Sequence, residues 1–252
     1  MVQTLAIIQA RMTSERLPGK VLADLGGSPV LAHVVSRVRS ASLVSETMVA
    51  TSTNVEDDPV AVLAQDLGIS CHRGSEQDVL GRFVDAVASR PDPPDVIVRV
   101  TGDCPLLDPG ATDAVIELLV GDSTLDYTSN VAPRTYPRGL DVEAFRSNAL
   151  ELAMELAATS DELEHVTLGM HTLHSDRFHC GSVCSEVNDS DLRWTVDYLE
   201  DLEVLETVVT ALDLAPTTEL RAHLPYRKVV EWFRAHPEVI AGNRHRATWT
   251  PG

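Results

Sequence analysis

The sequence predicts an α/β fold with an open, doubly wound and mostly parallel sheet, as in Rossmann-like nucleotide-binding proteins. Three short apolar runs rich in β-branched residues, at 5–8, 47–50 and 96–100, have the length and composition of buried strands. Segments with helical apolar spacing separate them, and this alternation is typical of a parallel sheet covered by helices. The 252-residue chain suits one such domain, which we assign to residues 1–241.

Proline marks the start of the helices that follow the first two strands. Ser28 and Pro29 are expected to be the N-cap and the first residue of a helix whose apolar face extends to Val38. Asp58 and Pro59 repeat this pattern before a second helix. Ser75 is expected to cap a third helix, in which apolar residues recur at helical spacing at Val79, Leu80, Phe83 and Val87.

The second half of the chain is less regular. The stretch 126–146 interrupts the alternation with prolines and a glycine and resumes as an alternating strand over 140–145, so we interpret it as a small insertion beside the active site. Periodicity then predicts two helices within 147–174, a strand within 178–187 and a helix over 199–212. The last residues, 242–252, show little periodicity and are expected to form a loosely held tail.

The charge balance restricts the classes of partner. Acidic residues number 38 against 20 lysines and arginines, and this net charge of −18 argues against a general nucleic-acid surface. Any anionic ligand must therefore be held by a local basic cluster. No apolar run approaches the roughly 20 residues of a membrane-spanning helix, and the start of the sequence lacks the features of a signal peptide. We expect a cytoplasmic protein with no membrane partner.

The four cysteines, Cys71, Cys104, Cys180 and Cys184, are too few and too scattered for a disulfide framework. Histidines at 165, 171, 174 and 179 precede or flank the last two, which raises the alternative of a zinc site. However, a single Cys-x3-Cys spacing without a second matching pair is not a standard zinc pattern. Buried thiols are the favoured interpretation.

The loop after the first strand, residues 9–20, contains three cations, two hydroxyl side chains and a glycine. Guanidinium and ammonium groups neutralise phosphate oxygens, and backbone amides in a turn add further donors. Ligands of open α/β sheets bind at the carboxyl ends of the strands, where this loop and residues 101–103 are expected to lie. The pattern therefore favours a triphosphate site, with a solvated loop of surface ion pairs as the alternative.

The order of residues in this loop, Ala10-Arg11-x-x-Ser14-x-Arg16-Leu17-Pro18-Gly19-Lys20, resembles the nucleotide-binding opening of the cytidylyltransferases that make CMP-activated acidic sugars. Within that group the chain is most similar to spore coat polysaccharide cytidylyltransferase-like proteins. Further matching stretches follow in order at 50–54 with 57–59, 72–75 with 78–80 and 82, 99–106, 139–143, 164–167 and 193–197. The resemblance covers about residues 5–210.

This resemblance implies a CTP site in which Arg16 and Lys20 meet the β- and γ-phosphates and residues near 51–54 and 73–75 recognise cytosine. A turn that caps the next helix is the alternative for 73–75. The residues expected to bind nucleotide are Ala10, Arg11, Ser14, Arg16, Lys20, Thr51, Ser52, Arg73, Ser75, Thr101 and Asp103. Four of them, Arg11, Arg16, Lys20 and Asp103, are expected to take part in catalysis.

Two aspartates are candidate magnesium ligands. Asp103 ends a buried strand, where a lone carboxylate needs a cation, and Mg²⁺ favours carboxylate oxygen together with substrate phosphate. The resemblance makes Asp197, after a short strand expected at 194–196, the second ligand. The alternatives are an N-cap or Asx-turn at Asp103 and an N-cap at Asp197.

The resemblance places the acceptor substrate near Asp141, Glu143 and His165, and we expect Arg138 to contribute to the same site. A hydrogen-bonding structural histidine is the alternative for His165. The family pattern around the histidine contains an arginine and a proline where this chain has Leu163 and Leu168, so the acceptor stays open. Arg134 and Arg138 are candidates for replacement positive charge.

We therefore predict an enzyme that transfers CMP from CTP to an acidic sugar or similar acceptor and releases pyrophosphate. The resemblance also implies a homodimer, in which the 126–146 insertion is a candidate contact. One alternative keeps this chemistry but takes a phosphonate or a phosphorylated small molecule as the acceptor. The other is a non-catalytic nucleotide-binding or glycosyltransferase-like protein.

Overall fold

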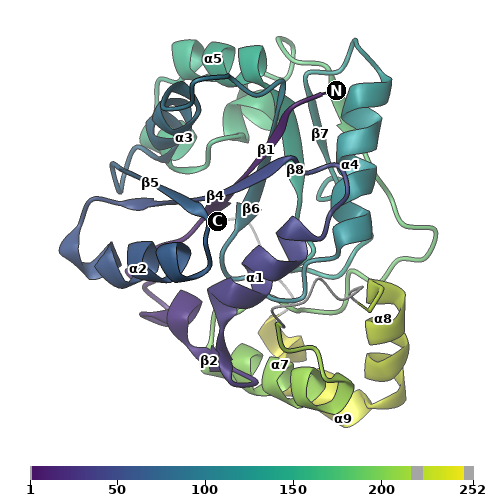
Figure 1. The fold of residues 1–252 in the computed structure, drawn as a ribbon. Helices are drawn as coiled ribbons and strands as arrows, with labels where there is room; N and C mark the ends of the chain where they lie inside the picture. The colour runs from purple at the N-terminus through teal and green to yellow at the C-terminus, as the bar shows by residue number, and fades with distance from the viewer. Residues whose placement is uncertain (1, 217–223, 247–252) are drawn as a thin grey trace.

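The computed structural model describes residues 2–216 and 224–246 and has a seven-stranded sheet at its centre, in the order β5-β4-β1-β6-β8-β7-β9 (Figure 1). The strands are β1 (Thr4–Gln9), β4 (Glu46–Ser52), β5 (Ser70–Gly74), β6 (Val96–Thr101), β7 (Tyr127–Ser129), β8 (Glu143–Arg146) and β9 (Cys180–Ser182). Only β8 runs antiparallel to its two neighbours. The predicted mostly parallel α/β sheet is confirmed.

Helices cover both faces of this sheet. One face packs against α1 (Val30–Arg39), α2 (Asp58–Asp66) and α4 (Pro109–Gly121), and the other packs against α3 (Val79–Ala88), α5 (Ser147–Leu156) and α6 (Ser160–Glu164). Strand alternation explains the division, because Ala6 and Ile8 of β1 point into the first layer whereas Leu5 and Ile7 point into the second. All four side chains are fully buried.

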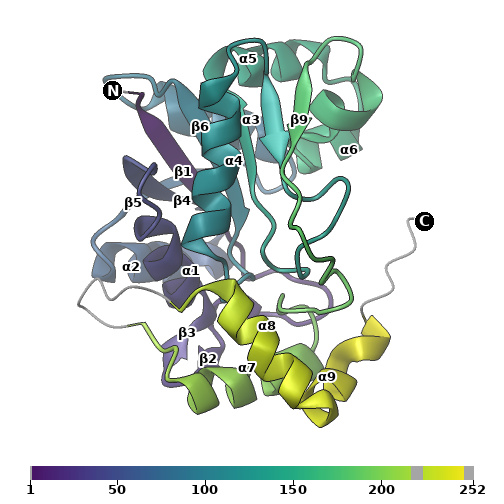
Figure 2. The same ribbon diagram turned by 90° about the vertical axis from the view of Figure 1, so that its right-hand side faces the viewer.

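A third apolar cluster joins the C-terminal helices to the end of the sheet that bears the site. Figures 1 and 2 show α7 (Leu199–Leu212), α8 (Tyr226–Ala235) and α9 (Pro237–Asn243) together at one end of the molecule. They pack around Trp194, whose ring stacks on that of Phe233 at a centroid distance of 5.4 Å. The short strand β2 (Asp24–Leu25), which pairs with β3 (Ser28–Pro29), contributes Leu25 to this cluster. The sequence analysis predicted α7 but missed α8 and α9.

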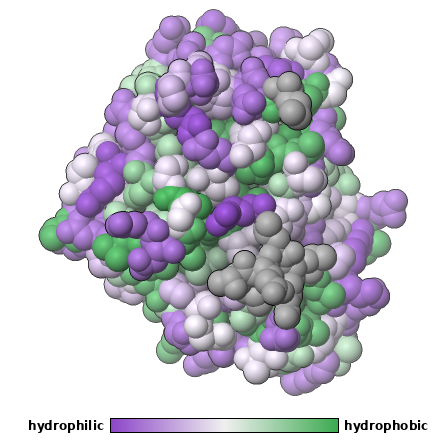
Figure 3. All heavy atoms as spheres, viewed as in Figure 1, coloured by the Kyte–Doolittle hydropathy of each residue, from purple (hydrophilic) through white to green (hydrophobic). Residues whose placement is uncertain are grey.

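Four single turns complete the described secondary structure. They are the 3₁₀ turns η1 (Lys20–Leu22), η2 (Val55–Asp57) and η4 (Arg244–Arg246) and the π-helical turn η3 (Gly169–Leu173). No helix within residues 2–216 and 224–246 is both long enough and apolar enough to cross a lipid bilayer. The face in Figure 3 shows hydrophilic residues spread among hydrophobic ones, in keeping with the acidic composition.

Three predicted helix starts were wrong in detail. Ser28 and Pro29 form β3, and α1 begins at Val30, because Pro29 has an extended backbone with ψ of 143°. Asp58 is the first residue of α2 instead of its cap. The cap of α3 is Asp78, whose carboxylate accepts from the Gly81 amide at 2.7 Å, while Ser75 lies in the preceding loop.

The stretch 126–146 is not an addition to the sheet, because it contributes β7 and β8 to it. Only the connection between those strands is irregular. The strand expected over 140–145 corresponds to β8, which begins later, at Glu143. Residues 194–196, also expected to be a short strand, do not belong to a paired strand. Within 178–187 only the three residues of β9 are paired. The two helices expected within 147–174 are α5 and α6.

The tail expected at 242–252 begins later than predicted. Residues 242–246 belong to the end of α9 and to η4. Asn243 is buried, and its amide donates to Asp201 Oδ1 at 2.9 Å and to the Arg193 carbonyl at 3.1 Å. Residues 247–252 lie outside the described part of the chain.

Candidate active site

A cleft of about 460 Å³ opens at the carboxyl ends of β1 and β6. The loop after β1 contributes Ala10, Arg11, Ser14, Arg16 and Lys20 to its lining, and the end of β6 contributes Thr101, Gly102 and Asp103. The two segments touch closely, since a β-carbon on Gly102 would lie only 3.0 Å from that of Ala10. The nucleotide residues predicted from these two segments therefore lie in one cleft.

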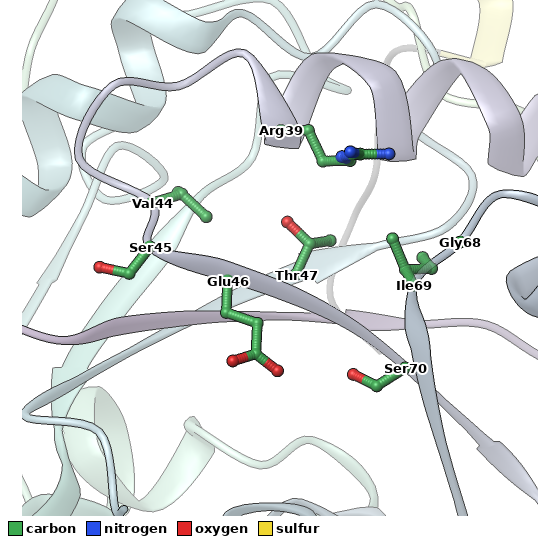
Figure 4. A pocket seen from close by; sticks show the side chains of 8 residues that line it. All are labelled: Arg39, Val44, Ser45, Glu46, Thr47, Gly68, Ile69 and Ser70. Carbon is green, nitrogen blue, oxygen red and sulfur yellow. The ribbon is translucent and has the colours of Figure 1, made fainter.

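A second, smaller pocket of about 310 Å³ lies near the amino ends of β4 and β5 (Figure 4). Its only charged lining residues are Arg39 and Glu46. A triphosphate needs several convergent cations, so this pocket is a poor candidate for the nucleotide site.

The loop after β1 is held in shape by its own backbone and by Asp57. Gly19 adopts a left-handed conformation (φ 75°), which favours glycine, and its amide donates to the Met12 carbonyl at 2.9 Å. The buried Asp57 carboxylate accepts from the Met12 amide at 2.6 Å and from the Ser52 amide at 3.1 Å. These contacts tie the loop to the end of β4, and η1 then directs Lys20 inward.

Lys20 lies between two carboxylates. Its Nζ atom is 2.5 Å from Asp103 Oδ2 and 2.8 Å from Asp197 Oδ1, and the three side chains are only 10%, 19% and 10% exposed. Thr101 donates its hydroxyl to the other oxygen of Asp103 at 2.6 Å. Burial alone would lower the pKa of Lys20, but the charges of the two aspartates outweigh it and raise the pKa. Lys20 is therefore a stable ammonium ion.

Asp197 contacts two further cations. Arg16 Nη2 lies 2.6 Å from Oδ1, and Arg193 Nη2 lies 2.7 Å from Oδ2. Arg193 also binds Asp201 through Nε at 2.8 Å and Nη2 at 2.9 Å. Burial would raise the pKa of Asp197, but Lys20 and Arg193 reverse the effect and the pKa is lowered. Asp197 is thus ionised and held in place.

Neither aspartate performs the structural role considered as an alternative. The Asp103 carboxylate accepts only from side chains within the described residues. At the start of α7 the capping carboxylate is that of Asp201, which accepts from the amides of Asp197 at 2.9 Å and Tyr198 at 3.0 Å. The Asp103 and Asp197 carboxylates therefore face the cleft cations instead of capping backbone.

This carboxylate pair fits a hard divalent cation. Oxygens of Asp103 and Asp197 converge on one positive charge, and Mg²⁺ is commonly bound by one or two carboxylates together with substrate phosphates and water.

Among the described residues, no group of three or more His, Cys, Asp or Glu side chains could hold a metal ion. The zinc alternative therefore has no support. Cys180 and Cys184 are exposed, and of the four thiols only Cys104 is fully buried, so the expectation of buried thiols was wrong for that pair.

The residues expected to read cytosine lie together but do not line the cleft. Arg73 donates to the carbonyls of Ser52 at 2.9 Å and Asn54 at 2.8 Å, which shapes the loop after β4. Thr51 and Ser52 are buried, and the Ser75 hydroxyl accepts from the Asp78 amide at 3.0 Å. Their role in base recognition stays a prediction.

The four predicted acceptor residues separate into different environments. His165 lines the cleft. Asp141 instead forms a two-bond ion pair with Arg134, at 2.5 and 2.9 Å. The Arg138 side chain has no ion pair within the described residues, and burial, followed by the charge of Arg134, lowers its pKa.

Glu143, the fourth predicted acceptor residue, is buried and does not line the cleft. Its carboxylate accepts from Arg99, from the Tyr127 hydroxyl at 2.6 Å and from the Thr167 hydroxyl at 2.6 Å. Burial would raise its pKa, but the charge of Arg99 and these hydrogen bonds lower it. The carboxylate is therefore ionised and fully occupied by protein donors.

Sequence reasoning missed three charged residues of this region. Arg99 lines the cleft, and Arg193 and Asp201 fix Asp197. The position of each of these residues relative to a predicted site residue was a signal in the sequence. Arg99 precedes Thr101 by two residues, so both are on one side of a strand, and 193, 197 and 201 follow one another at intervals of four.

A cation-rich loop beside a carboxylate pair, at the carboxyl edge of a parallel sheet, is typical of nucleotide-dependent transferases. Residues 5–175 match the model of a family described as Cytidylyltransferase. The chain belongs to that family and is a CTP-dependent nucleotidyltransferase. The match is shorter than the resemblance expected over residues 5–210.

Solved and curated relatives agree with this assignment. A cytidylyltransferase structure from Leptospira borgpetersenii superposes with a TM-score of 0.86 at 28% identity and covers all of both chains. The spore coat polysaccharide biosynthesis protein SpsF of Bacillus subtilis is 38% identical over 65% of this chain and 68% of its own. A 3-deoxy-manno-octulosonate cytidylyltransferase of Trichlorobacter lovleyi is 39% identical over 49% of this chain and 48% of its own.

Proposed function

We propose that this cytidylyltransferase transfers CMP from CTP to an acidic sugar or a related small-molecule acid, releases pyrophosphate and requires Mg²⁺. The observation that carries the proposal is the position of Lys20, which lines one cleft with Arg16 and Asp103 and whose ammonium group lies between the carboxylates of Asp103 and Asp197. The sugar-acid acceptor is supported by the names of two relatives, one in polysaccharide biosynthesis and one specific for 3-deoxy-manno-octulosonate.

In this proposal Arg11, Ser14, Arg16 and Lys20 bind the phosphates, and Asp103 and Asp197 hold the metal. Bound Mg²⁺ supplies positive charge to the phosphate oxygens. An acceptor oxygen attacks the α-phosphorus, and any proton that it carries passes to solvent. The bond from that phosphorus to the bridging oxygen breaks, so that pyrophosphate leaves with the electron pair. The cations of the loop stabilise the charge that develops on the leaving group. We assign no residue as the general base.

The charge balance of the site indicates how CTP and metal enter. Without ligands, Lys20, Arg16 and Arg193 neutralise Asp103, Asp197 and Asp201, three cations against three carboxylates. A divalent cation alone would add two uncompensated charges at a half-buried position, which is unfavourable. We infer that metal and nucleotide bind together. Lys20 and Arg16 would then leave the carboxylates of Asp103 and Asp197 to bind the phosphates, and the carboxylates would bind the metal.

Calorimetric titration with CTP, UTP, ATP and GTP, each with and without Mg²⁺, tests the core of the proposal without knowledge of the acceptor. Selective CTP binding that Mg²⁺ strengthens is the expected result. A preference for another nucleotide would overturn the cytidylyl assignment but not the site. CTP binding without pyrophosphate release from any acceptor would favour the non-catalytic alternative.

A panel of acids separates the acceptor classes by pyrophosphate release. Acidic sugars are expected to be active, whereas activity limited to phosphonates or phosphorylated molecules would support the second enzyme alternative. The homodimer and the cytoplasmic location remain predictions. Light scattering at micromolar concentration tests the homodimer.

A further inference from the structure

Arg99 is a cation in the cleft that the phosphate assignments leave unused. It lies on β6 two residues before Thr101, and alternation along a strand places both side chains on the same side of the sheet. Its side chain lines the cleft that also contains Lys20 and Asp103. Because the cations of the loop are assigned to the nucleotide, Arg99 is available to a second substrate.

A buried carboxylate holds Arg99 from behind. Arg99 is the cross-strand partner of Glu143, and its Nη1 atom forms an ion pair with Oε2 of that residue. Oε1 is taken by the Tyr127 and Thr167 hydroxyls, both at 2.6 Å. Glu143 is 7% exposed, so it orients the guanidinium and does not itself present a free carboxylate to a ligand.

The same carboxylate also anchors the segment that carries His165. Thr167 follows His165 by two residues, and its hydroxyl donates to Glu143. His165 lines the cleft together with Arg99. Glu143 therefore positions two polar side chains that reach the cleft from different elements, β6 and the end of α6.

The guanidinium of Arg99 has N–H donors that are not used by the contacts described above. Arginine carries five N–H groups, and here Nη1 binds Glu143 while Nη2 makes one long contact of 3.3 Å with the neutral Gln9 Oε1. The Nε atom is buried without a partner among the described residues. A partly exposed guanidinium with unused donors suits a planar oxyanion, which it can bind through two hydrogen bonds.

We propose that Arg99 binds the oxyanion of the acceptor, a carboxylate in the case of an acidic sugar, and thereby selects acids over neutral analogues. This inference rests on the proposed function. It also accounts for Leu163, which replaces the arginine of the family pattern and packs against the apolar cluster beneath α3 and α5. Arg134 and Arg138, the two candidates for replacement charge, do not line this cleft, and Arg134 is paired with Asp141.

The experiment compares an acid with its neutral counterpart. The probes are 3-deoxy-manno-octulosonate and its carboxamide, titrated calorimetrically into protein loaded with Mg²⁺ and α,β-methylene-CTP. The variants are Arg99→Met, Arg99→Lys and Glu143→Gln. Arg90→Met is the control, because the Arg90 side chain is about as exposed as that of Arg99 and also pairs with a glutamate, Glu46, but lies outside the cleft.

The wild type and Arg90→Met are expected to prefer the acid over the amide by about 10- to 100-fold, the range of a charge-assisted pair. Arg99→Met is expected to lose this preference, and Arg99→Lys and Glu143→Gln to retain part of it. Binding of CTP itself should stay within about threefold in each variant. Arg99→Lys keeps the test valid if the methionine variant does not fold.

Two results would overturn the assignment of Arg99 while CTP binding stands. One is an unchanged preference in both Arg99 variants, which would leave Arg99 with a structural role only. The other is a wild type that binds acid and amide equally. If the wild type bound no CTP, the proposed function would fail first, and this inference with it.

Discussion

Asp197 is the residue on which the candidate site depends most. Its carboxylate contacts Lys20, Arg16 and Arg193, and its own amide is fixed by Asp201. The pKa of Asp197 is lowered and that of Lys20 is raised, so this cluster stays ionised at neutral pH. Such a cluster is rigid without ligands, and any ligand must compete with its internal ion pairs.

Replacement of Asp103 by asparagine keeps the size of the side chain but removes one of the two charges that face Lys20. We expect pyrophosphate release to fall by about 100-fold or more, because one metal carboxylate is lost. A continuous pyrophosphate assay measures this. Asp92→Asn, at an exposed position outside the cleft, is the control and should stay fully active. Full activity of Asp103→Asn would refute the metal assignment.

Replacement of Lys20 by methionine should have opposite effects on the two ligands. With the ammonium ion gone, the two aspartates are free, and we expect Mn²⁺ to bind the nucleotide-free protein on the order of tenfold more tightly. Affinity for CTP should fall, since a phosphate partner is lost. Electron paramagnetic resonance of free Mn²⁺ measures the first effect. Replacement of the exposed Lys228 by methionine is the control for net charge. An unchanged Mn²⁺ affinity in Lys20→Met would contradict the proposed exchange of Lys20 from the carboxylates to the phosphates.

The sequence was most informative about residues in the stretches that resemble a known family. Lys20, Asp103 and Asp197 were predicted and do meet. Glu143 was expected to face the acceptor but lies beneath Arg99, because strand pairing decides which side chain is nearer the cleft. The residue pattern within one β-strand does not show which other strands will pair with it.

At the scale of elements, α1 is joined to the hairpin of β2 and β3 by a buried histidine. His33 is 1% exposed, and its Nε2 atom lies 2.7 Å from the Leu25 carbonyl, whereas Nδ1 has no partner in the described part of the chain. Burial lowers the pKa of His33 to about 4. The neutral imidazole is therefore part of the packing between these elements.

This histidine makes folding stability depend on pH in a defined window. The unfolded chain takes up a proton below its ordinary pKa of 6.5, but the folded protein does so only near 4, so stability falls as pH drops between these values. The gap corresponds to about 3 kcal/mol. Urea unfolding at pH 7 and pH 4 should show this extra loss in the wild type and in exposed His171→Gln, but not in His33→Gln. An equal loss in His33→Gln would contradict the assignment.

Elements were predictable where apolar periodicity was strong, but the residues at which their helices start were not. β1, β4 and β6 are close to their predicted ranges. The start of α3 was misplaced because Ser75 and Asp78 are both good caps, and only the structure shows that Asp78 accepts from Gly81. The helix α8 was missed although Val229, Val230 and Phe233 recur at helical spacing and form one apolar face, whereas the seven-residue α9 is too short to show a clear period.

At the scale of the whole molecule, the C-terminal helices are coupled to the site. Asn243 of α9 binds Asp201, which orients Arg193 and Asp197. The ring of Tyr198 lies against two guanidinium groups, with Arg16 at 5.4 Å and Arg246 at 3.9 Å from its centroid. Helices that the family match at 5–175 does not include therefore support the cleft.

Asn243→Ala tests this coupling. It removes two buried hydrogen bonds, so we expect the free energy of unfolding to fall by about 1–3 kcal/mol. Chemical denaturation measures the change. Asn148→Ala, at an exposed position of α5, should change it by less than about 0.5 kcal/mol. Equal effects of the two substitutions would show that the end of α9 does not stabilise the protein.

The separation of 177 residues between Lys20 and Asp197 has a consequence for the protein during its synthesis. The loop with Lys20 leaves the ribosome well before its second carboxylate partner, Asp197, is translated. A chain that stops before Asp197 has the nucleotide loop and Asp103 but lacks the other half of the proposed metal site. Prematurely terminated products are therefore expected to be inert, and they cannot consume CTP in the cell.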